Sequence, residues 1–394
     1  MRVYFDNNAT TPLAPEVRDA IIEALPVFGN PSSAHEFGRE ARALVEGARA
    51  DLARLLDVDP GELVFTSGGS ESNNIVIKSV MCRSGSCVFS SCHGKPHVIT
   101  TAVEHPCVLE SCHCLEHEGA EVTRLGVDSD GRVDPEELRR AIRPGTCLVS
   151  IMMANNETGT IQPIAELAAI AHERGILFHT DAVQAVGKIP VHPRELGVDF
   201  LTISGHKLNA PKGVGALWFR NQVAVCPLIT GGHQEGGRRA GTENTLGIVA
   251  LGAAARLALK DRDEAHERVA ALRDRLEKGI LERIPEVRIN SHPDFRLPNT
   301  LNVSFKYVEG ESILYLLDFE GIAISTGSAC SSGSLEPSHV LLAMGLDHGL
   351  AHGSIRFSLG RYSTSEEVDF TVEKLVAIIE RLRAMSPLYR TPRP

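Results

Sequence analysis

Long uncharged apolar segments are missing from this chain of 394 residues. The apolar stretch at residues 249–259 is interrupted by Arg256, whereas a helix that spans a bilayer needs about 20 consecutive apolar residues. The first six residues, MRVYFD, also lack the apolar region of a signal peptide. We therefore expect a cytoplasmic protein with no membrane association.

An excess of positive charge is missing as well. The chain has 40 Lys and Arg against 50 Asp and Glu, which gives a formal net charge of −10. This balance argues against nucleic acid as a partner, because such proteins carry clustered basic residues. With 43% apolar residues the chain can bury a large core, and its length suits two or three domains.

Paired cysteines of the CxxC type are absent, although the chain has nine cysteines. An odd number of cysteines without a signal peptide argues against a disulfide framework, so we expect reduced thiols. Six of them are close in sequence: Cys82, Cys87, Cys92, Cys107, Cys112 and Cys114. Four histidines lie among them: His93, His97, His105 and His113. Because the spacing is poor for zinc ligands, we favour ordinary core and surface thiols over a metal site.

Short apolar runs and helical segments alternate between about residue 60 and residue 220. The strand candidates are residues 63–66, 98–101, 121–125, 147–153, 176–180, 199–204 and 214–219. Helices are expected at residues 163–174, between two of these strands, and at residues 39–56, before the block. This alternation predicts an α/β fold with a mainly parallel sheet that helices cover on both faces.

A second unit is expected after residue 259. A charged segment at residues 260–283 has the apolar spacing of a long helix. Strand candidates at 300–305 and 322–325 follow, and then a final helix at 365–385. We therefore predict a large domain at residues 16–259 and a smaller α+β domain at residues 260–394.

Lys207 is the most informative residue of the chain. It belongs to the run SGHK and directly follows the strand candidate at 199–204, while Asp181 directly follows the one at 176–180. Open α/β sheets bind ligands at the carboxyl ends of their strands, so both side chains are expected at one site. A lysine for a Schiff base and a carboxylate for a pyridinium nitrogen are what pyridoxal phosphate (PLP) requires.

Other polar motifs follow neighbouring strand ends. The run SGGSESNN at residues 67–74 opens an expected helix, and a glycine-bearing helix N-terminus can bind a phosphate. The amide-rich turn ANNETG at residues 154–159 can reach a cofactor ring or a substrate carboxylate. His105 can stack on a flat ring, and Gln184 lies one helical turn beyond Asp181. Each motif alone is also common in ordinary caps and loops, but their shared position favours a site.

A candidate nucleophile lies far from these motifs in the sequence. Cys330 stands among small residues in the run STGSACSSGS at residues 325–334. Such a run is poor core material and suits an exposed loop that delivers a thiolate to a bound substrate. Downstream, Arg356 and Phe357 alternate as in a strand, so an inward Arg356 can bind a carboxylate with two hydrogen bonds.

These stretches resemble the cysteine desulfurases of the NifS/IscS group, which are class V PLP enzymes. The matching stretches span nearly the whole chain in the family's order: residues 6–12, 29–33, 104–105, 154–159, Asp181 with Gln184, 204–207, 239–244 and the cysteine loop. The resemblance implies a homodimer with fold type I of the PLP-dependent transferases. It further implies that residues 1–15 pack with the small domain.

The resemblance also implies a role for each site residue. Lys207 would bind PLP covalently, Asp181 would pair with the pyridinium nitrogen, and Gln184 would bond the phenolic oxygen. His105 would stack on the ring and belong to the catalytic groups. The phosphate would be bound by Gly69, Ser70, Ser204, His206 and, from the partner subunit, Thr242. The substrate carboxylate would be held by Asn156, which also borders the cofactor, and by Arg356.

The implied reaction is PLP-dependent removal of sulfur from L-cysteine. Cys330 would take the sulfur as a persulfide, with release of L-alanine, and pass it to an iron–sulfur scaffold or another acceptor protein. The sequence departs from the family pattern at Gly69-Ser70, where alanine-threonine is frequent, and at His233, where a glycine is usual. Whether the acceptor serves general cluster assembly, nitrogenase maturation or transfer-RNA thiolation stays open.

Two alternatives remain beside a cysteine desulfurase. A selenocysteine lyase or another class V aminotransferase would not depend on the thiol of Cys330. A cysteine-rich metal-binding or scaffold protein would contain stoichiometric metal and no yellow chromophore. The many cofactor positions found in order favour the desulfurase.

Overall fold

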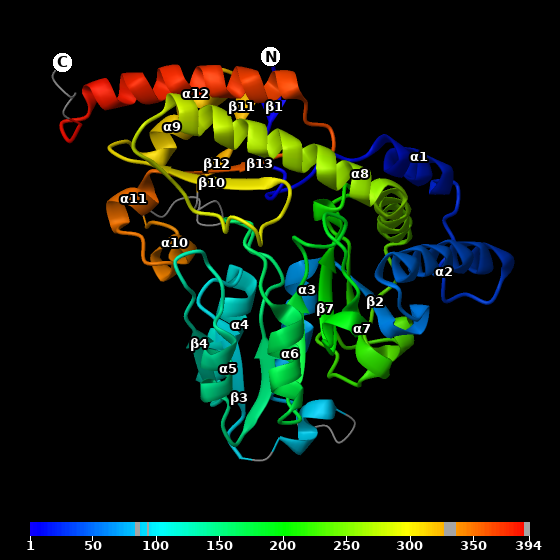
Figure 1. Cartoon of the computed structure of the whole chain (residues 1–394). Helices are drawn as coiled ribbons and strands as arrows, with labels where there is room; N and C mark the ends of the chain where they lie inside the picture. Colours follow the sequence, from blue (N-terminus) through cyan, green and yellow to red (C-terminus); the bar gives the residue numbers. More distant parts are fainter. Residues whose placement is uncertain (83–86, 93, 327–335, 390–394) are drawn as a thin grey trace.

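The computed structural model describes residues 1–82, 87–92, 94–326 and 336–389 (Figure 1). The predicted nucleophile Cys330 lies outside the described residues, as does His93. Figure 1 shows a large α/β unit below and a smaller unit above, and both chain ends are at the smaller unit.

Seven strands form the sheet of the large unit. They are β2 (Leu63–Thr66), β3 (His97–Thr101), β4 (Glu121–Leu125), β5 (Thr146–Ser150), β6 (Leu177–Asp181), β7 (Phe200–Ser204) and β8 (Gly215–Phe219). Their order is β2-β8-β7-β6-β5-β3-β4, and all neighbours pair parallel except β8, which runs antiparallel to β2 and β7. The prediction of a mainly parallel sheet is confirmed.

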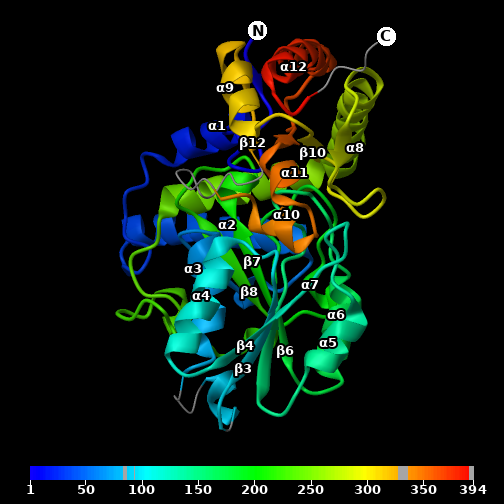
Figure 2. The same cartoon turned by 90° about the vertical axis from the view of Figure 1, so that its left-hand side faces the viewer.

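Helices cover both faces of this sheet (Figure 2). Those of the large unit are α1 (Pro15–Ala24), α2 (Glu36–Leu56), α3 (Gly69–Ser79), α4 (Pro106–His117), α5 (Pro135–Ala141), α6 (Ile164–His172), α7 (Pro193–Leu196) and the first part of α8 (Thr245–Arg283). Strand residues alternate between two cores, as the period of two requires. In β7, Leu201 and Ile203 join the core with α2, α6 and α8, whereas Phe200 joins the core with α3 and α4.

The small unit has its own sheet and core. Its strands are β9 (Val287–Ile289), β10 (Thr300–Phe305), β12 (Ser325–Thr326) and β13 (Ser354–Ser358), in the order β12-β13-β10-β9. Its helices are α9 (Gly310–Phe319), α10 (His339–Ala343), α11 (His348–His352) and α12 (Ser365–Met385). The N-terminal strand β1 (Val3–Tyr4) pairs with β11 (Ile322–Ala323), and Val3 and Phe5 are buried in this core. Residues from both ends of the chain therefore build the small unit.

Helix α8 contributes to both cores. Its first part carries Ile248 and Ala258 in the core of the large unit, and its second part carries Leu276 and Ile280 in the core of the small unit. Asp261 between them has non-helical angles, φ −137° and ψ 21°. The sequence predicted this helix only from residue 260, which is wrong, because its earlier part is buried on most sides and shows no polar face.

Two further expectations need correction. The strand expected at residues 322–325 is two short strands, since β11 pairs with β1 and β12 pairs with β13. The expectation that all thiols are free is wrong for Cys82 and Cys226, which form a disulfide across 144 residues of sequence. Spacing along the chain could not reveal this pair, because the fold brings the two cysteines together. Among the described residues, no helix combines the length and apolar character needed to cross a membrane.

Candidate active site

A cavity of about 340 Å³ lies where the carboxyl ends of β6 and β7 face β13 of the small unit. Ten predicted site residues line it: Gly69, Ser70, His105, Asn156, Asp181, Gln184, Ser204, His206, Lys207 and Arg356. Parallel strands place the residues that follow them at one edge of the sheet. The fold thus brings together groups that the sequence distributes over almost 300 positions.

Asp181 is the buried carboxylate of this cavity. It ends β6 and is only 7% exposed. Its Oδ1 accepts a hydrogen bond from the backbone N–H of Val183 at 2.9 Å, and its Oδ2 accepts one from Asn73 Nδ2 at 2.7 Å. Both donors are neutral, so they orient the carboxylate and leave its charge available for a cationic group.

Lys207 reaches the cavity from the turn that follows β7. Its Nζ donates to the backbone carbonyl of Ala9 at 2.7 Å and also to that of Asn8. The backbone carbonyl of His206, the preceding residue, accepts from the Thr11 hydroxyl at 2.8 Å. The N-terminal segment therefore holds the lysine turn in place.

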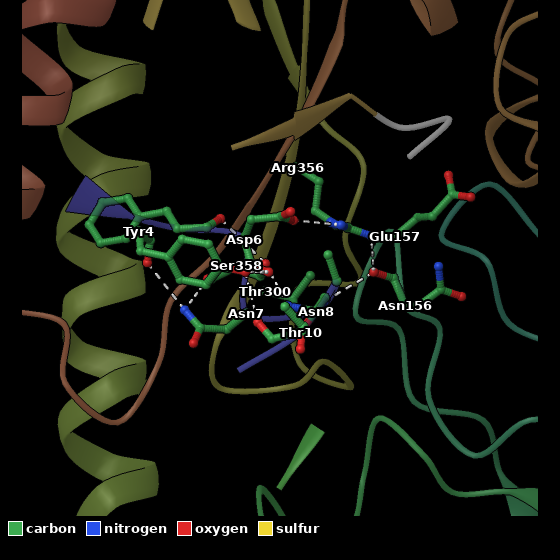
Figure 3. Close-up of polar contacts among 12 residues, drawn as sticks. Tyr4, Asp6, Asn7, Asn8, Thr10, Asn156, Glu157, Thr300, Arg356 and Ser358 are labelled. Carbon is green, nitrogen blue, oxygen red and sulfur yellow. Dashed lines mark hydrogen bonds and ion pairs between the residues drawn. The ribbon is translucent and has the colours of Figure 1, made fainter. Parts of the chain in front are cut away.

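Asn8 connects that segment to both sides of the cavity (Figure 3). Its Nδ2 donates to the carbonyl of Asn156 at 3.0 Å and to Thr300 Oγ1 at 2.9 Å. Its own carbonyl accepts from Gln184 Nε2 at 3.0 Å. One buried residue, through its side-chain amide and its backbone carbonyl, thus holds the turn after β5 and the side chain of Gln184.

Lys188 fixes the other end of Gln184. Its Nζ donates to Gln184 Oε1 at 2.7 Å. Burial, together with the nearby charges of Lys207 and Arg356, lowers the pKa of Lys188 well below its ordinary value. The Gln184 amide is therefore oriented by partners on both sides, with Nε2 as its donor toward the N-terminal segment.

Two histidines of the cavity are held in the neutral state at pH 7. His105 Nδ1 accepts from the backbone N–H of Cys107 at 3.1 Å, so the ring proton resides on Nε2. Burial lowers the pKa of His105, against the opposing effect of the Asp181 charge. Burial also lowers the pKa of His206 to about 4, and the charge of Lys207 acts in the same direction.

The N-terminus of α3 forms a cradle beside Ser204. This helix of 11 residues begins at Gly69, and its first N–H groups have no partner within the helix, which favours an anion there. A Cβ atom on Gly69 would lie 2.9 Å from Val183 Cγ2, so glycine keeps the approach open. In the first turn Glu71 is paired with Arg239, 2.8 Å between Oε1 and Nε, which compensates the one carboxylate there.

Arg356 is the guanidinium of the cavity, and Figure 3 shows it between Asp6 and the turn at Asn156. Its Nη2 pairs with Asp6 Oδ1 at 2.7 Å and its Nη1 donates to the Asn156 carbonyl at 3.1 Å. Its Nε has no hydrogen-bond partner among the described residues. Because leaving a buried donor unpaired is costly, the site has a capacity for a further acceptor. Phe357 packs in the core of the small unit, as the strand alternation predicted.

Comparison with known proteins agrees with this geometry. Residues 3–370 match the family model of class-V aminotransferases. The cysteine desulfurase IscS of Dictyoglomus turgidum is 54% identical over 386 residues, which cover 98% of this chain and 96% of that protein. The chain belongs to the cysteine desulfurases of the class-V aminotransferase family.

Solved structures of this family agree with the fold. A NifS-like protein has a TM-score of 0.89 at 41% identity and covers 97% of this chain and 100% of its own. The protein SspA, solved in complex with cysteine, has a TM-score of 0.79 at 37% identity, with coverages of 92% and 100%. The predictions of family, fold class and PLP dependence are confirmed.

The cavity of this cysteine desulfurase fits PLP. An amine on Lys207, a buried carboxylate on Asp181 and a helix N-terminus at Gly69 face one space, and these groups complement the aldehyde, the ring nitrogen and the phosphate of the cofactor. The unpaired Nε of Arg356 leaves a donor for an amino-acid carboxylate.

Two predicted residues do not line the cavity. Thr242 lies in an exposed loop before α8, and Cys330 lies outside the described residues. Sequence reasoning also missed the contributions of Asp6, Asn8 and Lys188 to the site. Asp6 and Asn8 belong to the polar run DNNATT, which was the available signal in the sequence. The structure shows that Asn7 and Asn8 of this run are buried despite their polarity.

Proposed function

We propose that this chain is a PLP-dependent cysteine desulfurase that takes sulfur from L-cysteine, releases L-alanine and holds the sulfur as a persulfide on Cys330. The observation that carries this proposal is that Lys207, Asp181 and Arg356 line one cavity. An amine and a carboxylate serve the cofactor, and a guanidinium serves the carboxylate of an amino acid.

The chain offers a partner for each part of PLP. Lys207 would hold it covalently, Asp181 would pair with its ring nitrogen, and Gln184 would bond its phenolic oxygen. His105 would lie on its ring face, and the phosphate would be bound by Gly69, Ser70, Ser204 and His206. When bound, PLP supplies an electron sink that stabilises negative charge beside the α carbon of the substrate.

Arg356 and Asn156 would orient the substrate. The guanidinium is buried and already fixed by Asp6 and by the Asn156 carbonyl, so a carboxylate would meet donors that need no rearrangement. Asn156 borders the same cavity.

The described residues on either side of Cys330 support its role as sulfur acceptor. Ser325 of β12 pairs in register with Arg356. The segment that leads to Cys330 therefore begins beside the arginine proposed to bind the substrate. Beyond the undescribed run, Ser338 Oγ donates to Glu157 Oε2 at 2.5 Å, next to Asn156. Both ends of the cysteine loop are therefore attached beside the cavity.

The proposed sulfur transfer is balanced in atoms. The Cys330 thiolate attacks the substrate sulfur, an S–S bond forms and the C–S bond of cysteine breaks. The electron pair of the broken bond stays with the β carbon, which takes a proton. The products are a persulfide on Cys330 and L-alanine, and no external oxidant or reductant is consumed.

The proposal includes a homodimer. Thr242 is exposed, as expected for a residue that would reach a partner's phosphate site. Four large apolar side chains are also exposed on and around α1 and the start of α2: Ile22, Leu25, Phe28 and Phe37. A second copy of the chain is the occupant we assign to this surface. Light scattering of the purified protein tests it, and a monomer would contradict it.

The acceptor we assign is an iron–sulfur assembly scaffold, and the IscS name of the similar Dictyoglomus protein supports this choice. Acceptor proteins of nitrogenase maturation and of transfer-RNA thiolation are the alternatives to be compared. A cytoplasmic location belongs to the same proposal. Sulfur transfer from the loaded enzyme to purified acceptors of each kind would discriminate among them.

The principal test compares Cys330→Ala with Cys114→Ser, a control at an exposed free cysteine on α4. The assay contains a dithiol, which reduces the persulfide and releases its outer sulfur as sulfide. We expect Cys330→Ala to bind PLP and to change its visible absorption when cysteine is added, but to release neither alanine nor sulfide. The control should retain both products. A selenocysteine lyase or another class V enzyme would retain turnover in Cys330→Ala, and that result would overturn the proposal.

A further inference from the structure

Three cysteine sulfurs lie together in the large unit, away from the active-site cavity. Cys82 follows α3, Cys87 precedes the short helix η2 (Val88–Ser91), and Cys226 follows β8 and the turn η4 (Arg220–Gln222). Their sulfur atoms all lie within 4.8 Å of one another. Among the described residues, no other three His, Cys, Asp or Glu side chains bring their ligand atoms this close together.

Hydrogen bonds, in addition to the disulfide, hold these segments together. The carbonyl of Ser79, the last residue of α3, accepts from the Cys87 thiol at 3.7 Å. The Ser79 hydroxyl accepts from the backbone N–H of Cys226 at 3.2 Å. The backbone N–H of Val88 donates to the carbonyl of Ala224 at 2.8 Å. The three sulfurs are therefore presented by a fixed backbone, with Cys87 buried and the other two half-buried.

This arrangement suits a soft divalent cation. Zinc binds thiolates at about 2.3 Å in a tetrahedron, which places two sulfur ligands about 3.8 Å apart. Sulfur atoms that lie within 4.8 Å of one another require only small side-chain adjustments to reach that geometry. A third sulfur beside a disulfide has no role in the disulfide itself, whereas a zinc site uses all three.

We infer that Cys82, Cys87 and Cys226 bind one Zn²⁺ in the reduced chain, with a water completing the tetrahedron. The site was not visible from the sequence, where only the poor spacing of residues 82–114 could be judged. Cys226 is 139 residues beyond Cys87, and only the fold adds it to the other two.

The disulfide and the zinc site are alternative states of the same two sulfurs. A dithiol reductant supplies two electrons and two protons to the Cys82–Cys226 disulfide and becomes a disulfide itself. Zinc then displaces the protons of the three thiols. The oxidised state releases the metal, since a disulfide sulfur is a poor ligand compared with a thiolate.

The site would stabilise the large unit and leave the reaction unaffected. Helix α3 begins at the phosphate cradle and ends before Cys82. Its 11 residues, about 16 Å in length, therefore separate the cysteine cluster from the cradle. The η2 segment lies at the lower end of the large unit in Figure 1, opposite the small unit. Zinc there would join segments 144 residues apart and so restrict the unfolded chain.

The test measures zinc per chain by mass spectrometry in the full-length Cys330→Ala protein, which lacks the reactive thiol. The protein is reduced with a dithiol and incubated with Zn²⁺, and gel filtration then removes unbound and weakly bound metal. We expect one zinc per chain, retained in the matched control Cys114→Ser. Cys87→Ser should hold roughly tenfold less under the same conditions. X-ray absorption should show zinc–sulfur distances of about 2.3 Å.

Cys87→Ser is the decisive variant, because it leaves the disulfide pair intact. Zinc content unchanged by Cys87→Ser would overturn the inference, as would a reduced protein that binds no zinc. Iron in place of zinc after purification would overturn the choice of metal. PLP content reports whether each variant has folded. Should Cys87→Ser not fold, Zn²⁺ must raise the Tm of the reduced Cys330→Ala protein, and a Tm that does not respond to Zn²⁺ would count against the site.

Discussion

Arg356 and Asp6 form a partly buried ion pair, with 2.7 Å between Nη2 and Oδ1, that connects β13 to the N-terminal segment. The same guanidinium donates to the carbonyl of Asn156 at 3.1 Å, yet its Nε has no hydrogen-bond partner among the described residues. The arginine is therefore oriented before any substrate binds. The N-terminal segment, which carries no predicted catalytic group, becomes part of the proposed substrate site through this pair.

Replacement of Arg356 by lysine should weaken cysteine binding. A lysine keeps the charge but cannot contact Asp6, Asn156 and a carboxylate with one planar group. We expect KM for cysteine to rise roughly tenfold, equivalent to about 1.4 kcal/mol, with a smaller change in kcat. Steady-state alanine release measures both constants. Arg275→Lys, in an exposed pair with Asp369, is the control, and equal KM values in the two variants would refute the assignment.

Asp181→Asn should impair use of the cofactor while leaving the fold intact. The amide can still accept from the N–H of Val183, but it no longer provides the negative charge that keeps a pyridinium nitrogen protonated. An opposite charge in contact shifts a pKa by about one to three units, so kcat should fall roughly 10- to 1,000-fold. PLP content and alanine release measure the two effects separately. Asp263→Asn, whose side chain is 82% exposed, should behave as wild type, and normal kcat in Asp181→Asn would exclude the proposed pairing.

The sequence predicted the sheet and most of the cavity, because the informative side chains follow strand ends. Asp181 and Lys207 were found this way, and a strand end is recognisable from its apolar run. The structure shows where this reasoning stops. Asn8 and Lys188 reach the cavity from segments without such a signal, and their roles depend on contacts across 176 and more positions of sequence.

Two errors of the sequence prediction have a common physical origin. The first part of α8 lacks a polar face because it is buried in the core of the large unit, so periodicity could not detect it. Cys226 joins Cys82 and Cys87 only through the fold. Both features belong to tertiary packing, which local patterns do not encode.

Glu104 should make the free energy of unfolding depend on pH. It is buried; its Oε1 accepts from Thr101 Oγ1 and from the N–H of Met152, and its Oε2 has no partner among the described residues. Burial raises the pKa of Glu104 to about 8. The unfolded state ionises above about pH 4.5 while the native state keeps its proton, so this group lowers stability progressively from about pH 4.5 to about pH 8.

Glu104→Gln removes this titration and keeps both hydrogen bonds to the side-chain oxygen. Relative to wild type, the variant should gain roughly 3 kcal/mol of unfolding free energy between pH 5 and pH 8. Urea unfolding at the two pH values measures the difference. Glu116→Gln, at a half-exposed carboxylate paired with Arg124, should show no such gain. A constant difference between Glu104→Gln and wild type at both pH values would disprove the buried neutral carboxyl.

Gly159 ends the turn that carries Asn156, and its replacement should damage both stability and substrate binding. The residue has φ +76°, and a Cβ there would lie 2.8 Å from Thr300 Cβ. Thr300 also binds Asn8, so a displaced Thr300 would disturb the contacts behind the cavity. Left-handed backbone alone costs about 1–2 kcal/mol in a non-glycine residue, and crowding adds about 1–3 kcal/mol.

Gly175→Ala separates the two costs, since this glycine has φ +67° and open space around its Cβ position. We expect Gly175→Ala to lose only the backbone contribution and to keep its KM for cysteine. Gly159→Ala should lose more unfolding free energy by about 1–3 kcal/mol and should raise KM, because Asn156 and Asn8 move with Thr300. Urea unfolding and steady-state kinetics give the two comparisons. Equal losses of stability in both variants would show that Thr300 moves away from the added Cβ without an energetic cost. The turn would then be no rigid support for the substrate site.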